Sequence, residues 1–322
     1  MEMMTNKTRW FFLLPSSQEA EERHIYDIAF GVKCLLSRNI SLSDIVFVID
    51  NASSVKVSAV FSKMQLSEPS EIFSTKQIDT LLCSNTYKNA VVFVTGHGSS
   101  AGLDSNIPIK PYCLYKKFQI SPNFKRVVFY FGQCYSGIFN QMPLSNHLSL
   151  PKSEHNNHCN IVAIGGTGLF PSISASVTCN DVTWSANIFL ISVFNWILEP
   201  KDIDGDEKFS VMDSFKSAAI DTNAELIEIK KRDNIQNFQQ QAKLFSLIGK
   251  LKTGSVSQTE KENVLLEIQA LERMLAIHYV VQDDLDSHGA SYNIPFIRIG
   301  IAALKPKGIG VGDKVRIIIV KE

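Results

Sequence analysis

The sequence lacks the features that mark membrane proteins, disulfide-rich proteins and nucleic-acid-binding proteins. Its N-terminal apolar run, 10–14, is shorter than a signal-peptide core and far shorter than a membrane span. The six cysteines are scattered without a C-x-x-C pair, which favours reduced thiols over a disulfide framework or a zinc site. Lysine plus arginine and aspartate plus glutamate number 32 each, so no net charge attracts nucleic acid or an anionic membrane.

The remaining composition is that of an ordinary packed protein. Hydrophobic residues make up 45% and charged residues 20% of the chain. A length of 322 residues fits one large α/β domain with an appendage, and no internal repeat or low-complexity tract interrupts it. We therefore expect an intracellular, cytoplasmic protein without a membrane segment, a nucleic-acid partner or a cofactor.

Two short apolar runs, 91–95 and 127–131, organise the rest of the sequence. They are rich in β-branched and aromatic residues, too short for helices, and each runs into a glycine, so they predict buried parallel strands. His97 follows the first run and Cys134 follows the second. Reactive groups of open α/β sheets lie just past the carboxyl ends of strands, so this pair is a candidate Cys/His dyad.

Strands and helices alternate along the N-terminal two thirds of the chain. This pattern predicts a three-layer α/β/α sandwich with a mostly parallel sheet of about five strands. The expected strands are 9–14, 45–49, 91–95, 127–131 and 161–164. The expected helices are one capped by Ser16 or Ser17 and ending near Arg38, one at 75–84, one near 112–118, and an apolar one at 184–198.

The C-terminal third has a different pattern. Residues 210–279 are mostly helical in periodicity, and the polar stretch 250–261 divides them into two helices that we expect to form a hairpin. Segments 296–304 and 315–320 predict two strands. We expect one domain over 1–220, and the hairpin with the C-terminal strands over 221–322, packed on the same domain.

The candidate dyad has a clear chemical rationale. A thiol is a poor nucleophile at neutral pH unless a neighbour such as imidazole generates the thiolate. Gly98 leaves a backbone N–H free to donate to an oxyanion, and the N–H of Cys134 is a second donor if the turn after the strand leaves it unpaired. The alternative is that Cys134 is a buried apolar side chain and His97 an ordinary loop histidine.

The segments Val94-Thr95-Gly96-His97-Gly98 and Cys134-Tyr135-Ser136-Gly137 together resemble the caspase-like cysteine peptidases, most closely the legumain and GPI-transamidase branch. Those enzymes place His-Gly after one hydrophobic strand and Cys-x-Ser/Ala-Gly after the next. The similarity covers about residues 9–220, and it includes the strand 45–49 with its acidic end.

The resemblance implies a caspase/legumain-like sandwich and a cysteine endopeptidase that forms a thioester. Cys134 would be the nucleophile, His97 the general acid/base, and the N–H groups of Gly98 and Cys134 the oxyanion hole. No third catalytic carboxylate is expected, which leaves Asp50 and Asp104 as bystanders. The substrate would be a protein or peptide, and an activating partner, a ligand or self-cleavage in loop 138–160 would control the enzyme.

Three alternatives stay open. The same dyad supports ligation or transamidation if an amine replaces water. A non-catalytic member would keep the fold as a scaffold or interaction protein. A different thiol hydrolase would need a Gly-x-Cys-x-Gly elbow, and the stretch around Cys134 lacks the final glycine.

The substrate-binding residues are less well defined by the sequence. Members of the family often carry a substrate-reading side chain two residues before the nucleophile, where this chain has Gly132. Gln133 follows it and, by strand alternation, is expected to face the other way. Loop 165–181, with Ser172 and Ser174, is expected to line the pocket, and the preference for Asn, Asp or basic residues is undecided.

Two groups of residues resemble metal ligands only weakly. Asp202, Asp204, Asp206 and Asp213 have the alternate spacing of a calcium loop, but Glu207 stands where an EF-hand has glycine. We favour an acidic turn before a helix capped by Ser210, with Asp213 completing a capping-box-like pair. The second group, His155, His158 and Cys159 with His147 nearby, lacks a second spaced pair of ligands and predicts a polar loop.

Overall fold

The computed structural model describes residues 8–141, 159–255, 257, 260–274 and 296–300. They form two compact units. The first contains the described residues up to 222 together with 296–300, and the second contains those from 223 to 274. Of the predicted loop 138–160, residues 138–141 are instead helical. Residues 142–158 of that loop, including His147, His155 and His158, and the predicted strand 315–320 lie outside the described residues.

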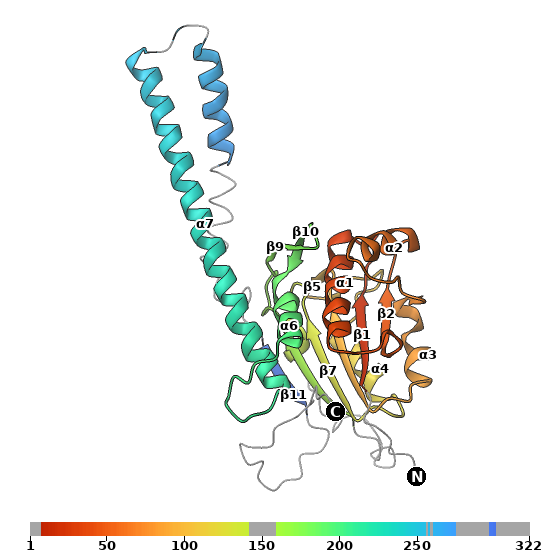
Figure 1. Ribbon diagram of the computed structural model, residues 1–322. Coiled ribbons are helices and arrows are strands. Elements are labelled where there is room, and N and C mark those ends of the chain that lie inside the picture. The colour runs from red at the N-terminus through yellow and green to blue at the C-terminus, as the bar shows by residue number, and fades with distance from the viewer. Residues whose placement is uncertain (1–7, 142–158, 256, 258–259, 275–295, 301–322) are drawn as a thin grey trace. The chain divides into compact units, whose positions relative to one another are not determined.

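A seven-stranded sheet forms the centre of the first unit, in the order β11-β8-β7-β4-β1-β2-β3 (Figure 1). Its strands are β1 (Thr8–Leu14), β2 (Ile45–Ile49), β3 (Ile72–Phe73), β4 (Asn89–Val94), β7 (Arg126–Phe131), β8 (Asn160–Gly165) and β11 (Phe296–Gly300). Every neighbouring pair is parallel except β11 and β8. The predicted α/β class with a mostly parallel sheet is confirmed.

Helices cover both faces of this sheet and make it the middle of three layers. The helices are α1 (Glu22–Ser37), α2 (Ser54–Lys63), α3 (Ile78–Cys83), α4 (Pro111–Gln119), α5 (Gly137–Gln141) and α6 (Ile188–Leu198). Side chains of β1 alternate between the layers. Phe12 packs with α1, α2 and α6, whereas Phe11 and Leu13 pack with α3, α4 and α5. Burial on both faces explains why the strands are continuous apolar runs.

The helix expected after Ser16 or Ser17 begins later than predicted. α1 starts at Glu22, because the two serines have other partners. Ser16 donates its hydroxyl to the carbonyl of Gln18, and Ser17 donates both its N–H and its hydroxyl to Asp104. These bonds hold a bend at residues 17–19 before the helix, and no side chain caps it at Glu21.

The apolar helix predicted at 184–198 is wrong over its first four residues. Strands β9 (Ser174–Cys179) and β10 (Val182–Asn187) form an antiparallel hairpin, and α6 begins only at Ile188. The Asn187 side chain caps α6 by accepting from the N–H of Leu190 at 2.9 Å. Trp184 belongs to the strand because its indole stacks on Tyr26 and is buried. Residues 174–179 of the expected loop 165–181 therefore form a strand. Helix α2 is a further element that we did not predict.

Two helices make up most of the described part of the second unit. α7 (Val211–Thr253) spans the boundary between the units, and the helix 260–274 follows it. Leu247 packs against Ile268 and Leu271 in a small apolar cluster, and Gly254 adopts a φ of 66° where α7 has ended. The predicted division into two helices is confirmed.

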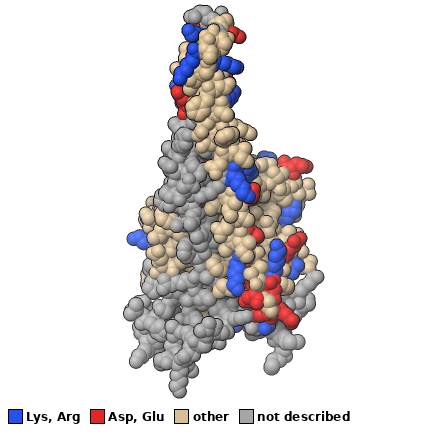
Figure 2. All heavy atoms as spheres, turned by 90° about the vertical axis from the view of Figure 1, so that its left-hand side faces the viewer, with Lys and Arg blue, Asp and Glu red and all other residues tan. Residues whose placement is uncertain are grey.

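Two surface properties follow from the described residues. Basic and acidic side chains both occur on the face drawn in Figure 2, as equal numbers of the two charges lead one to expect. In the part of the chain that the structure describes, no helix is long and apolar enough to cross a membrane.

The central aromatic contact of the sheet provides a test of the fold. Phe93 is 1% exposed and its ring contacts Phe12, Tyr130 and Phe194. Phe93→Ala removes these contacts and leaves a cavity, so we expect the free energy of unfolding to fall by about 3–5 kcal/mol in denaturant titrations. Val55→Ala, at a position 77% exposed, is the control and should change it by less than about 0.5 kcal/mol. Equal effects of both variants would contradict this packing.

Candidate active site

The two predicted functional loops leave the same edge of the sheet side by side. β4 and β7 are parallel neighbours with Val94 opposite Phe131, and His97 and Cys134 each follow their strand by three residues. Gly98 contacts the second loop directly, because a Cβ built there would lie 2.4 Å from the backbone oxygen of Cys134. Position 98 therefore admits only glycine without movement of the backbone.

The loop that carries Cys134 is held by segment 167–172. Tyr135 adopts a φ of 57°, and its N–H donates to the carbonyl of Phe170 at 2.8 Å. The Ser136 hydroxyl donates to the carbonyl of Thr167 at 3.1 Å and accepts from the Thr167 N–H at 3.0 Å. Cys134 lies at the start of this turn, and its side chain is half-buried.

The sulfur of Cys134 has one close donor. The N–H of Ser172 lies 3.2 Å from Sγ, and the Ser172 hydroxyl lies 3.6 Å from it. The backbone of segment 167–172 therefore contacts the sulfur directly and holds it at the turn. In the described part of the chain, no hydrogen bond uses the backbone N–H of Cys134.

His97 is bound to a carboxylate. Its Nε2 lies 2.6 Å from Oε1 of Glu21, and both side chains are about half exposed. Arg23 donates through Nε to the other oxygen of Glu21 at 2.6 Å. The hydrogen bonds from Arg23 and from His97 lower the pKa of Glu21 to about 2, so its carboxylate is ionised at neutral pH. Among the described residues, none of the hydrogen bonds joins His97 to Cys134.

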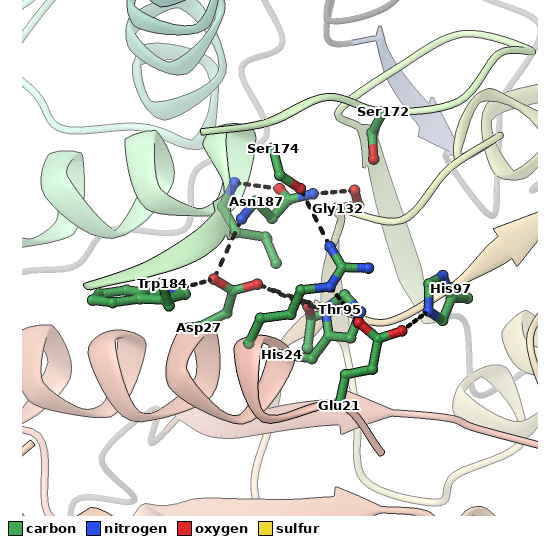
Figure 3. Close-up of polar contacts among 12 residues, drawn as sticks. Glu21, His24, Asp27, Thr95, His97, Gly132, Ser172, Ser174, Trp184 and Asn187 are labelled. Atoms are coloured by element: carbon green, nitrogen blue, oxygen red, sulfur yellow. Dashed lines mark hydrogen bonds and ion pairs between the residues drawn. The ribbon is translucent and has the colours of Figure 1, made fainter. Parts of the chain in front are cut away.

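A polar network that includes the buried residues His24, Thr95 and Asp27 lies next to His97 (Figure 3). The His24 ring meets the His97 ring edge-on, with ring centroids 5.3 Å apart. Nδ1 of His24 lies 3.2 Å from the Thr95 hydroxyl, which donates to Asp27 at 3.2 Å. Asp27 also accepts from the Trp184 indole at 3.0 Å and from the backbone N–H of Asn187 at 3.3 Å.

The network reaches the strand end that precedes the cysteine. The amide of Asn187 donates to the carbonyl of Gly132. A Cβ at Gly132 would lie 2.7 Å from the Leu190 side chain, so the residue packs against α6. Helix α1 and the two strand ends are thus joined by one set of hydrogen bonds.

The four predicted substrate-binding residues lie in different surroundings. Gly132 and Gln133 are buried, and neither amide atom of Gln133 has a hydrogen-bond partner among the described residues. Ser172 contacts the sulfur of Cys134. The Ser174 hydroxyl instead accepts from Arg23 of α1 at 3.4 Å.

Asp50 and Asp104 have structural partners. Asp50 accepts from the N–H and the hydroxyl of Thr75, where a short 3-10 helix begins ahead of α3. Asp104 accepts from the N–H and the hydroxyl of Ser17, and its own N–H donates to the carbonyl of His97 at 3.1 Å. Asp104 thereby fixes the backbone of the histidine loop.

The acidic turn behaves as a helix start. Asp202 accepts from the backbone N–H groups of Gly205, Asp206 and Glu207. Oxygens of Asp202, Asp204 and Asp206 come within 4.8 Å of one another. Asp213 is not in that group. It pairs reciprocally with Ser210 at the start of α7, as predicted, and hydrogen bonds from Ser210 lower its pKa despite burial.

The other thiols differ from Cys134 in their surroundings. All six cysteines are free. Burial raises the pKa of Cys34 and of Cys159 to about 12, so both stay protonated at neutral pH. Cys159, the one member of the predicted His-x-x-His-Cys group that the structure describes, is therefore an apolar core residue.

Glu21, Arg23, His24 and Asp27 are residues of the candidate site that the sequence analysis does not include. Glu21 and Arg23 carry no signal in the sequence that predicts their contacts. His24 and Asp27 carried a usable signal, because they lie among Ile25 and Ile28 on the predicted buried face of α1. Polar residues at i and i+3 of a buried helix face indicate a shared buried contact.

No protein-family model matches this chain, and no curated protein matches it with significant similarity.

The contact between the two loops can be tested by adding one methyl group. Gly98→Ala places a carbon against the Cys134 carbonyl and Gln133, so we expect the free energy of unfolding to fall by about 1–3 kcal/mol. Gly249→Ala is the control, since no atom lies within 4 Å of a Cβ at that position. Thermal unfolding that leaves the two variants equally stable would contradict the contact.

The ionisation of Glu21 can be followed by carbon NMR of its side-chain carboxyl. The pKa is depressed from its usual 4.5 to about 2, so the stabilising contribution is present above pH 4.5 and is lost as the pH falls towards 2. Arg23→Gln removes the largest cause and should raise the titration midpoint towards 4.5. Lys63→Gln, an exposed change on α2, should leave it unchanged. An unmoved midpoint in Arg23→Gln would disprove the assignment.

Proposed function

We propose that this chain is a cysteine endopeptidase of the caspase/legumain-like type, with Cys134 as nucleophile and His97 as general acid/base. The observation that carries the proposal is the direct contact of the two loops, with Gly98 against Cys134 at the ends of neighbouring parallel strands. Reactive groups of α/β sheets gather at this edge. The Ser172 N–H that donates to Sγ of Cys134 supports the nucleophilic role.

The reaction proceeds through a covalent thioester. The sulfur of Cys134 attacks the carbonyl carbon of the scissile peptide bond as its proton passes to His97, and the N–H groups of Gly98 and Cys134 stabilise the oxyanion. The C–N bond then breaks as His97 delivers a proton to the leaving amine. Water attacks the thioester, His97 accepts a proton from it, and the acid product leaves the regenerated thiol. An amine in place of water would give ligation or transamidation.

The substrate is a protein or peptide whose chain crosses the mouth between the two loops. Ser172 and Ser174 lie on this side, and Ser174 is bound to Arg23. The six free thiols suit a reducing, intracellular compartment. The ion pair between Glu21 and His97 supports control by an activating partner or ligand, because His97 has to leave Glu21 to serve Cys134.

The same ion pair favours a second candidate function. A histidine engaged by Glu21, together with a cysteine engaged by Ser172, suits a non-catalytic scaffold that retains the fold. The two candidates differ in the reactivity of one sulfur atom.

Labelling with an electrophilic peptide probe distinguishes the two candidates. For the peptidase, we expect mass spectrometry to find the probe on Cys134, and His97→Ala to slow labelling by about 10²–10⁴-fold. Cys113→Ala, which removes an exposed thiol, should leave the rate unchanged. Probes with different end residues would also report the cleavage preference.

The scaffold predicts a different result. If Cys134 reacts no faster than the exposed thiols Cys83 and Cys113, the peptidase is wrong. Thermal unfolding of His97→Ala checks that slower labelling does not come from a loss of fold.

A further inference from the structure

We propose that Glu21, His24 and His97 form a binding site for a zinc ion. One carboxylate oxygen and one ring nitrogen from each histidine all lie within 4.8 Å of one another. Two imidazoles and a carboxylate are a preferred zinc donor set, with the fourth position left to water or another ligand. The site itself does not depend on the peptidase function, although one consequence below does.

The buried nitrogen of His24 is the strongest indication. His24 is 5% exposed, and its Nε2 is buried without a hydrogen-bond partner among the described residues. A buried polar atom left unpaired destabilises the fold. Such an atom beside a second imidazole and a carboxylate has the surroundings of a metal ligand.

The hydrogen bonds around His24 determine which nitrogen carries the proton. The Thr95 hydroxyl has one proton and donates it to Asp27. Its oxygen can therefore accept from Nδ1–H of His24, 3.2 Å away. In the neutral ring this hydrogen bond places the proton on Nδ1 and leaves the lone pair on Nε2. Metal-binding histidines characteristically donate their other N–H to such an outer partner, which fixes ring and tautomer.

The charges around the three ligands and the freedom of the exposed side chains to move are compatible with a bound zinc ion. Arg23 holds Oε2 of Glu21, which leaves Oε1 for the metal. Tetrahedral zinc needs ligand atoms about 3.3 Å apart at bond lengths near 2.0–2.1 Å. The half-exposed side chains of Glu21 and His97 can close that distance around the fixed His24 ring.

Zinc binding would remove His97 from catalysis. On binding, Nε2 of His97 exchanges its hydrogen bond to Glu21 for the metal. The proton that Nε2 donated goes to solvent from a charged ring, or to Nδ1 of a neutral one. The imidazole can then no longer exchange protons at Cys134. This consequence rests on the proposed peptidase function and makes the site a reversible inhibitory one.

The test is calorimetric titration of Zn²⁺ into the full, metal-free chain. We expect a wild-type site whose affinity falls at least tenfold in Glu21→Gln and in His24→Gln. Glu22→Gln changes the neighbouring exposed carboxylate of the same helix and should bind as wild type does. Because Glu21 is on the surface, its variant remains informative if His24→Gln does not fold.

Nitrogen NMR of the imidazoles gives a second measurement. Zinc should shift Nε2 of His24 while Nδ1 stays protonated. Wild-type protein that binds no zinc, a Glu21→Gln affinity within about twofold of wild type, or a His24 Nε2 unaffected by zinc would each overturn the site.

Probe labelling separates failure of this site from failure of the peptidase. If zinc binds as predicted but Cys134 is unreactive without metal, the site stands and the peptidase is wrong. If Cys134 reacts quickly and saturating zinc does not slow it, the peptidase stands and the inhibitory site is overturned. Zinc that slows wild type but not Glu21→Gln supports both.

Discussion

The buried carboxylate of Asp27 is the interaction on which the candidate site depends. Its two oxygens accept from the Thr95 hydroxyl at the end of β4, from the Trp184 indole in β10, and from the N–H of Asn187 at the start of α6. A buried carboxylate without such donors would cost several kcal/mol. Asp27 therefore joins α1 to the sheet edge, and through Thr95 it orients His24 beneath His97.

Two kinds of constraint meet at this edge. Backbone pairing of β4 with β7 determines where the two loops begin, and Gly98 lets them touch. Side chains from α1 then decide what surrounds His97, since Glu21 holds its ring on the outside and His24 lies against it on the inside. The proposed peptidase and the proposed zinc site use the same imidazole. His97 therefore cannot transfer protons at Cys134 and bind the metal at the same time.

Local pattern predicted the sheet well and its surroundings less well. β2 begins and ends where its apolar run does, and β4 and β7 differ from their predicted spans by one or two residues. These strands are buried on both faces, so their sequences are continuously apolar. Residues 184–187 directly precede the apolar run of α6 and were expected to be helical, yet they form a strand. The contacts of Trp184 with Tyr26 and Asp27 outweigh the helical pattern there.

The sequence by itself determined the α/β class, the two strand ends and the presence of His97 and Cys134 just beyond them. Short apolar runs that end in glycine are local features, and parallel strands bring such ends to one edge. Only the tertiary structure decided what contacts His97. Glu21 is 76 residues away in the chain, and it arrives there because β1 pairs with β4 and α1 follows β1. Neither the partner of Glu21 nor the unpaired nitrogen of His24 follows from periodicity, because both depend on packing between distant segments.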